Sequence, residues 1–189
     1  MYKTSDFESA ENCILDEVRC ALGAIDPEKV VMYLNAVVSA EKVFFVGVGR
    51  TLLSLEGIAK RYAHLGIHSV VVGQITEPAI TDKDVLIVGS GSGGTLFPVG
   101  IAKKAKSVGA KIIHIGSNPA SSLTDVEDLF IRIPVESRAM MPDEIHSQQP
   151  MTSLFEQSLL LFGDATAMMI IREKNLDLHS LWEFHANLE

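Results

Sequence analysis

Cysteine, tryptophan and positive charge are scarce in this chain of 189 residues. Its two cysteines, Cys13 and Cys20, fall on one expected helix about two turns apart, on the order of 10 Å, which is too far for a disulfide. The chain has 16 Lys and Arg residues against 24 Asp and Glu residues, and the resulting net charge of -8 disfavours a nucleic-acid-binding surface. We therefore expect neither a disulfide framework nor a nucleic-acid partner.

Long uninterrupted apolar runs and metal-ligand spacings are also lacking. The segment 1–6 has no apolar stretch of the secretory type, and no run reaches the length that a membrane span needs. Four scattered histidines, His68, His114, His146 and His179, show no ligand spacing for a metal. With 47% hydrophobic and 21% charged residues, the composition predicts one cytoplasmic globular domain without a membrane partner, metal or cofactor.

The most distinctive segment present is the run GSGSGGT at 89–95, which follows an apolar stretch and opens into a helix-like one. Its hydroxyl groups and glycine N–H groups suit an anion at the positive N-terminus of a helix. No lysine follows, so the run is not a nucleotide P-loop. The spacing G-x-G-x-x-G is present, but the ribose-binding acid expected roughly 20 positions later is missing. A phosphate group is the favoured ligand, and a turn without a ligand is the alternative.

Apolar periodicity divides the chain into helices and short buried strands. Two helices come first, one from a capping box at Ser5 to about Gly23 and one that starts at Asp26-Pro27. Almost wholly apolar runs then predict five strands buried on both faces, at 43–46, 69–72, 85–88, 111–115 and 129–133. Helices are expected at 52–65, 97–108 and 152–172, with a helical turn at 121–126 and a last helix from near Asp177.

This alternation predicts an α/β fold, a three-layer α-β-α sandwich around a five-stranded parallel sheet. We expect flavodoxin-like strand order 2-1-3-4-5 in a single domain, with N-terminal helices at 1–40, the sheet core at 41–134 and C-terminal helices at 151–189. Ligands of such sheets bind at the switch point, here between the first and third strands. There the turn at 47–51 would face the serine-rich run, and Arg50 would bind a phosphate or sugar hydroxyl. A surface arginine that caps its own loop is the alternative.

Six segments together resemble a known family. They read GVGRT at 47–51, AHLG at 63–66, ITDKD at 80–84, SGSGGT at 90–95, QPMTSLFEQ at 149–157 and HANLE at 185–189. The chain is similar to the sugar isomerase (SIS) domain family, and the last two segments resemble its 6-phospho-3-hexuloisomerase branch. That resemblance implies a phosphosugar isomerase that converts 3-hexulose 6-phosphate to fructose 6-phosphate through a cis-enediol, without metal or other cofactor.

The resemblance also implies a set of site residues. Glu156 would be the catalytic base, and His185 would move protons at oxygen, in a neighbouring subunit by analogy with the family. The phosphate ligands would be Ser90, Ser92, Gly93, Thr95 and Thr51, and the remaining substrate contacts would be Gly49 and Arg50. Without the resemblance, the favoured interpretation of Glu156 is an acid that stabilises a helix N-terminus, and that of His185 is a residue of a frayed terminal helix.

Three positions depart from the family pattern. Gly94 replaces an acidic residue common in the phosphate loop, Phe184 replaces an arginine before the terminal histidine, and Thr51 replaces a serine. A pentulose or tagatose phosphate therefore stays open as the substrate. A sugar-phosphate-binding regulator, or a deglycase or lyase of a phosphorylated amino sugar, stays open as the function.

The expected helix at 152–172 has almost no polar face, so a single small core does not account for its burial. We expect a homo-oligomer in which subunits cover this helix. The family resemblance implies a tetramer built of dimers with shared active sites. A central core helix in a monomer is the alternative.

Overall fold

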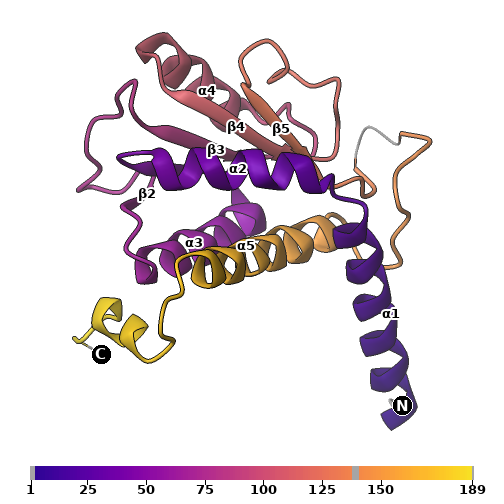
Figure 1. Cartoon of the computed structure of the whole chain (residues 1–189). Helices are drawn as coiled ribbons and strands as arrows, with labels where there is room; N and C mark the ends of the chain where they lie inside the picture. Colours follow the sequence, from indigo (N-terminus) through magenta and orange to yellow (C-terminus); the bar gives the residue numbers. More distant parts are fainter. Residues whose placement is uncertain (1–2, 138–140, 189) are drawn as a thin grey trace.

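A parallel sheet of five strands forms the centre of the chain, and the computed structural model describes residues 3–137 and 141–188 (Figure 1). The strand order is β2-β1-β3-β4-β5, and all neighbouring pairs are parallel. The strands are β1 (Val43–Val46), β2 (Ser69–Val71), β3 (Val85–Gly89), β4 (Lys111–Gly116) and β5 (Leu129–Arg132). The predicted fold class and strand order are confirmed.

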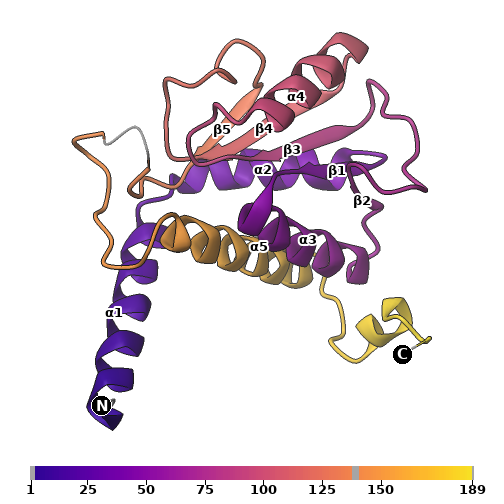
Figure 2. The ribbon, with the colours of Figure 1, turned by 180° about the vertical axis from the view of Figure 1, so that it is seen from behind.

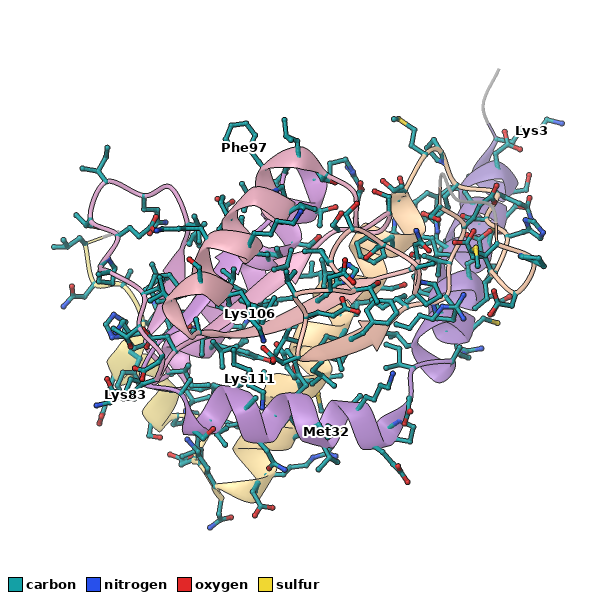
Figure 3. The ribbon with its side chains drawn as sticks, turned by 90° about the horizontal axis from the view of Figure 1, so that it is seen from above. Lys3, Met32, Lys83, Phe97, Lys106 and Lys111 are labelled. Atoms are coloured by element: carbon teal, nitrogen blue, oxygen red, sulfur yellow. The ribbon has the colours of Figure 1, made fainter. Side chains whose placement is uncertain are left out.

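Helices cover both faces of the sheet and so produce the predicted layers (Figure 3). On one face, α4 (Leu96–Val108) packs against a cluster that includes Phe44, Leu86 and Ile112. On the other, α2 (Pro27–Ser39) and α3 (Gly49–His64) contact the strands, and α5 (Ser153–Glu173) packs along α3. Both faces of β1 and β3 are thereby buried, which explains why their sequences are uniformly apolar.

The first helix, α1 (Thr4–Gly23), extends away from this body (Figures 1 and 2). Only Val18 and Ala21 of α1 are buried, near its C-terminal end. Its predicted start at Ser5 is wrong. The N-cap is Lys3, two residues before Ser5, and Asp6 Oδ2 accepts a hydrogen bond from the Lys3 N–H at 2.9 Å. The predicted cap of α2 is confirmed, since the Asp26 carboxylate accepts the Glu28 N–H.

Two segments predicted as helical are short in the structure. The stretch 121–126, predicted as a helical turn, is a hydrogen-bonded turn that does not extend into a helix: the Thr124 N–H donates to the Ser121 carbonyl and the Val126 N–H to the Leu123 carbonyl, while Ser121 Oγ accepts the Leu123 N–H. The last helix is only a short 3₁₀ helix, η1 (Ser180–Phe184), and none of its residues is buried. Only Leu181 of this segment packs against the core cluster, and so small a packed face does not sustain a longer α-helix. Glu189, the end of the HANLE motif, lies outside the described residues.

Helix α5 is the one helix among residues 3–137 and 141–188 that is long and apolar enough to cross a membrane by length and composition. It packs instead against α3, α1 and α2, and 56% of its most apolar stretch is buried within the fold. Buried core helices of soluble proteins pass the same test, so the length and composition of α5 are weak evidence for a membrane span.

Candidate active site

The turns after β1 and β3 open on one cavity of about 620 Å³, at the carboxyl ends of the strands. This is the switch point at which the neighbours of β1 and β3 lie on opposite sides. Six of the predicted ligand-binding residues line the cavity: Gly49, Arg50, Thr51, Ser90, Ser92 and Thr95. The structure therefore brings together two segments that lie about 40 residues apart in the chain.

The serine-rich run forms a turn held by its own hydroxyl groups. Ser90 Oγ accepts the Gly93 N–H at 3.1 Å and lies 3.0 Å from Thr95 Oγ1, and Ser92 Oγ accepts the Gly94 N–H at 3.3 Å. Thr95 is the N-cap of α4 and its side chain makes no cap hydrogen bond. The first N–H groups of α4 thus lie beside a cluster of hydroxyls, which is an arrangement suited to a phosphate.

Gly93 does not line the cavity, although the sequence predicted it as a phosphate ligand. Its φ of +62° is in the left-handed region, and a Cβ there would lie 2.2 Å from Ser121 Cβ and 3.0 Å from His114 Cε1. Only glycine combines this backbone conformation with such a close approach. In this structure Gly93 shapes the loop.

Below the loop lies His114 of β4, which is fully buried. Its Nε2 is 2.9 Å from the Ser90 carbonyl oxygen, and its Nδ1 is 2.7 Å from Glu127 Oε2. The imidazole therefore connects the phosphate loop to the segment that enters β5. This support went unpredicted because it depends on the register between β3 and β4.

Glu156, in the first turn of α5, lines the same cavity and is 8% exposed. Its carboxylate forms an ion pair with Arg50 Nε, and its Oε1 accepts a hydrogen bond from Thr152 Oγ1 at 2.9 Å. The Arg50 side chain is 64% exposed, so its guanidinium is accessible to a ligand in the cavity. Arg50 belongs to the first turn of α3 and not to a loop, because α3 already begins at Gly49.

The peptide carbonyl of Glu156 is fixed as well. Ser54 Oγ of α3 donates a hydrogen bond to it at 2.8 Å. A buried carboxylate whose main chain and side chain are both held is pre-organised for proton transfer to a bound molecule. The cavity thus places a possible base opposite a possible phosphate anchor.

Part of the cavity wall was not predicted from the sequence. Ser137, Pro150, Met151, Thr152 and Phe155 also line it. Four of these belong to the segment 149–157, whose pattern pointed only to Glu156. Their closeness in sequence to Glu156 was the available signal, because Pro150, Met151 and Thr152 directly precede α5.

His185 does not line this cavity but lies beside His64 at the C-terminal end of α3. Figure 1 shows the C-terminus of the chain near that end of α3. His185 stacks on His64, with ring centroids 5.3 Å apart, and contacts Trp182 with centroids 5.0 Å apart. His64 is the last residue of α3 and Arg50 is near its start, so the two ends are about 20 Å apart at 1.5 Å per residue. Within one chain, His185 is not brought to Glu156.

Metal-ligating side chains do not cluster in the described part of the chain. Residues 3–137 and 141–188 contain no group of three His, Cys, Asp or Glu placed to hold a metal ion. Both cysteines are free thiols.

Comparison with known proteins places these features in a family. Residues 37–168 match the SIS domain. A protein of Bacillus subtilis (strain 168) named 3-hexulose-6-phosphate isomerase is 36% identical over 176 residues, which cover 93% of this chain and 95% of that protein. One of the same name from Mycobacterium gastri is 35% identical over 184 residues, covering 97% and 92% of the two chains.

Solved structures agree with these sequence matches. A Methanococcus jannaschii protein, for which a molecular function of 3-hexulose-6-phosphate isomerase is inferred, has a TM-score of 0.83 and 29% identity over 96% of this chain and 99% of its own. A putative sugar-phosphate isomerase from Listeria monocytogenes has a TM-score of 0.80 at 15% identity over 98% of each chain, which shows a shared fold. On these matches, the chain belongs to the SIS domain family.

Proposed function

We propose that this chain is a ketose-phosphate isomerase that converts 3-hexulose 6-phosphate to fructose 6-phosphate. Relatives that share more than a third of its residues over nearly the whole chain carry this activity in their names. The observation that carries the proposal is the cavity itself, where a buried Glu156 carboxylate and a hydroxyl-lined helix N-terminus lie on the same walls.

The serine-rich loop binds the phosphate in this scheme. Ser90, Ser92, Thr95 and Thr51 supply hydroxyl groups, and the start of α4 supplies backbone N–H groups. Hydrogen bonds to a charged group contribute about 1.5–3 kcal/mol each, so a few such bonds fix one end of the sugar. The reacting carbons then lie toward Glu156.

Glu156 is the base that moves a proton between C2 and C3. Its carboxylate takes the proton from C2, the electron pair of that C–H bond forms the C2=C3 double bond, and the carbonyl oxygen at C3 takes a proton from His185 of a neighbouring subunit, which the C2 hydroxyl proton later restores. The hydroxyl at C2 then loses its proton as the new carbonyl forms, and Glu156 returns a proton to C3. Arg50, now paired with Glu156, supplies positive charge where the enediolate oxygens develop.

The reaction needs no metal in this proposal, because Arg50 and the hydroxyl donors carry the charge stabilisation. Full activity after dialysis against EDTA is the expected result. Loss of activity that returns with a divalent cation would contradict it.

His185 acts in the site of a second subunit. Its place beside His64 is remote from Glu156 in the same chain, whereas the exposed apolar side chains of α3 and α5 suit contact between copies. We propose a tetramer built of dimers in the cytoplasm, where reduced thiols such as Cys13 and Cys20 persist.

A substrate panel tests the proposed function. Purified protein is incubated with hexulose, pentulose and amino-sugar phosphates, and the products are identified by NMR. Conversion of 3-hexulose 6-phosphate to fructose 6-phosphate is expected to be the fastest reaction. Release of an amine or acid would contradict the proposal and indicate a lyase or deglycase. Tight binding without any turnover would contradict it and indicate a sugar-phosphate sensor.

A further inference from the structure

Glu17, on α1, makes an unusually well-satisfied contact with a segment about 130 positions later in the chain. Its carboxylate accepts hydrogen bonds from Ser147 Oγ at 2.6 Å, from the Gln148 N–H at 2.7 Å and from Gln149 Nε2 at 3.0 Å. The thiol of Cys13, one turn earlier on α1, lies 3.5 Å from Glu17 Oε1. One side chain thus holds three consecutive residues.

The segment that Glu17 holds leads directly into the candidate active site. Pro150, Met151 and Thr152 follow it and line the cavity. Met151 has a φ of +56°, a left-handed conformation that a side-chain-bearing residue adopts only when its surroundings impose it. Thr152 then donates its hydroxyl hydrogen to Glu156 Oε1. A short run of chain therefore connects the Glu17 contact to the proposed base.

The contact between Glu17 and the segment 147–149 lies at the edge of the fold, where α1 leaves the body. The C-terminal end of α1 lies beside the start of α5, and the rest of α1 projects from the body (Figures 1 and 2). Pro150 lines both the active-site cavity and a second groove bordered by Asp6, Ser9 and Cys13 of α1. The segment 148–150 is thus a wall shared by α1 and the site.

The charge of Glu17 suits this role. Desolvation raises its pKa, but the hydrogen bonds from Ser147, Gln148, Gln149 and Cys13 outweigh it, and the pKa lies below its usual value of 4.5. The side chain is therefore an ionised acceptor at neutral pH. A carboxylate has two acceptor oxygens and can accept all three hydrogen bonds from this segment. A neutral amide has one acceptor oxygen and cannot replace it in full.

We propose that Glu17 is a positioning residue for the isomerase reaction, which fixes the segment 147–152 so that Thr152 orients the Glu156 carboxylate. The inference rests on the proposed function only for its kinetic consequence. Its structural part, that Glu17 restrains this segment, holds in the unliganded protein and is measurable without substrate.

The test compares Glu17→Gln and Glu17→Ala with the control Asp16→Asn. Asp16 neighbours Glu17 on α1, but it pairs only with Arg19 at the surface. Hydrogen exchange of the unliganded protein is expected to rise about 10-fold or more at the Gln148 amide in Glu17→Ala, less in Glu17→Gln and not in Asp16→Asn. The melting temperature and exchange in the sheet serve to separate local from global loosening.

Kinetics supply the second readout. Both Glu17 variants are expected to lower kcat for 3-hexulose 6-phosphate, by about 10-fold in Glu17→Ala, while KM changes less than about 2-fold because the phosphate loop is untouched. In a Thr152→Val background the Glu17 substitutions should have almost no further effect on kcat, since the connection is already broken.

Unchanged exchange at Gln148 in both variants overturns the proposal, as does an unchanged kcat. A kcat loss that adds fully to that of Thr152→Val, or one accompanied by faster exchange throughout the sheet, also overturns it and shows a general structural role. Absence of turnover in the wild type would refute the proposed function, and the exchange result would still decide whether Glu17 restrains the segment.

Discussion

At the scale of single residues, the proposed phosphate anchor and the proposed base come from different parts of the chain. Ser90, Ser92 and Thr95 belong to one turn at the start of α4, and Glu156 to the first turn of α5. Arg50 connects the two walls, since it lines the cavity and pairs with Glu156. Binding and chemistry are therefore separable by substitution.

Ser92→Ala tests the anchor. Loss of one hydrogen bond to a charged phosphate is expected to raise KM about 10-fold or more and to leave kcat within about 2-fold, because the anchor binds ground state and transition state alike. Ser107→Ala is the matched control, since Ser107 lies on the exposed last part of α4 and bonds only its own helix. Steady-state kinetics with the hexulose phosphate measures both variants. A KM for Ser92→Ala that equals the KM for Ser107→Ala would show that Ser92 has no part in binding.

Residues of the cavity could be predicted from the sequence only where a local pattern marked them. The hydroxyl-rich run and the motif before Glu156 are each continuous in sequence, and both line the cavity. The supports of these residues, His114 under Ser90 and Glu17 beside Gln148, join positions far apart in the chain. No local spacing signals such contacts, because they exist only once the sheet and α1 are in place.

At the scale of elements, burial on both faces made the strands predictable, since a strand covered by two helical layers carries almost no polar residue. Capping chemistry located the start of α2 for the same local reason. The prediction was wrong for the C-terminal helix, which is only a short 3₁₀ helix because few of its side chains pack against the rest of the fold.

Neighbouring strands also share a buried ion pair at their entry. Asp84, just before β3, is 1% exposed and lies 3.1 Å from the Lys42 ammonium, just before β1. Burial raises the pKa of Asp84, but hydrogen bonds from Thr81 and the charge of Lys42 outweigh this and hold the pKa below its usual 3.8. A lowered folded-state pKa stabilises the fold above the unfolded value, and that contribution is lost as pH falls through the folded value.

The unfolding free energy should therefore decline below about pH 4 in the wild type, and less steeply in Asp84→Asn. At pH 7 the variant is expected to be less stable by about 3 kcal/mol, because Lys42 loses its partner. Urea denaturation from pH 7 to pH 3 measures both effects, with Asp16→Asn as an exposed control. Parallel curves for wild type and Asp84→Asn would show that this pair does not contribute to the acid dependence.

At the scale of the whole molecule, large apolar side chains are exposed on several helices, α3 and α5 among them. Leu53 of α3 is 65% exposed, and Leu161 and Met168 of α5 are 42% and 52% exposed. Figure 3 shows Met32 of α2 likewise on the outside. An exposed apolar surface of this kind indicates contact with another protein surface. In the proposed assembly, a second copy would also supply the His185 that one chain does not bring to its own Glu156.

Leu161→Glu tests this assembly. A charge at the interface is expected to shift the protein to a smaller species in analytical ultracentrifugation and to lower activity in proportion, because no second subunit then supplies His185. The control Ile75→Glu places the same charge on a fully exposed loop residue. An unchanged sedimentation coefficient for Leu161→Glu would remove this face from the interface.

The most direct test of the central claim is proton exchange by wild type and Glu156→Gln with fructose 6-phosphate in deuterated water. The wild type should place deuterium at C3, the carbon from which the reverse reaction removes a proton. Glu156→Gln should slow this exchange by about 10²–10⁴-fold while its Kd for fructose 6-phosphate changes only about 3-fold or less. Exchange at the wild-type rate in Glu156→Gln, or deuterium at C1 instead of C3, would contradict the account.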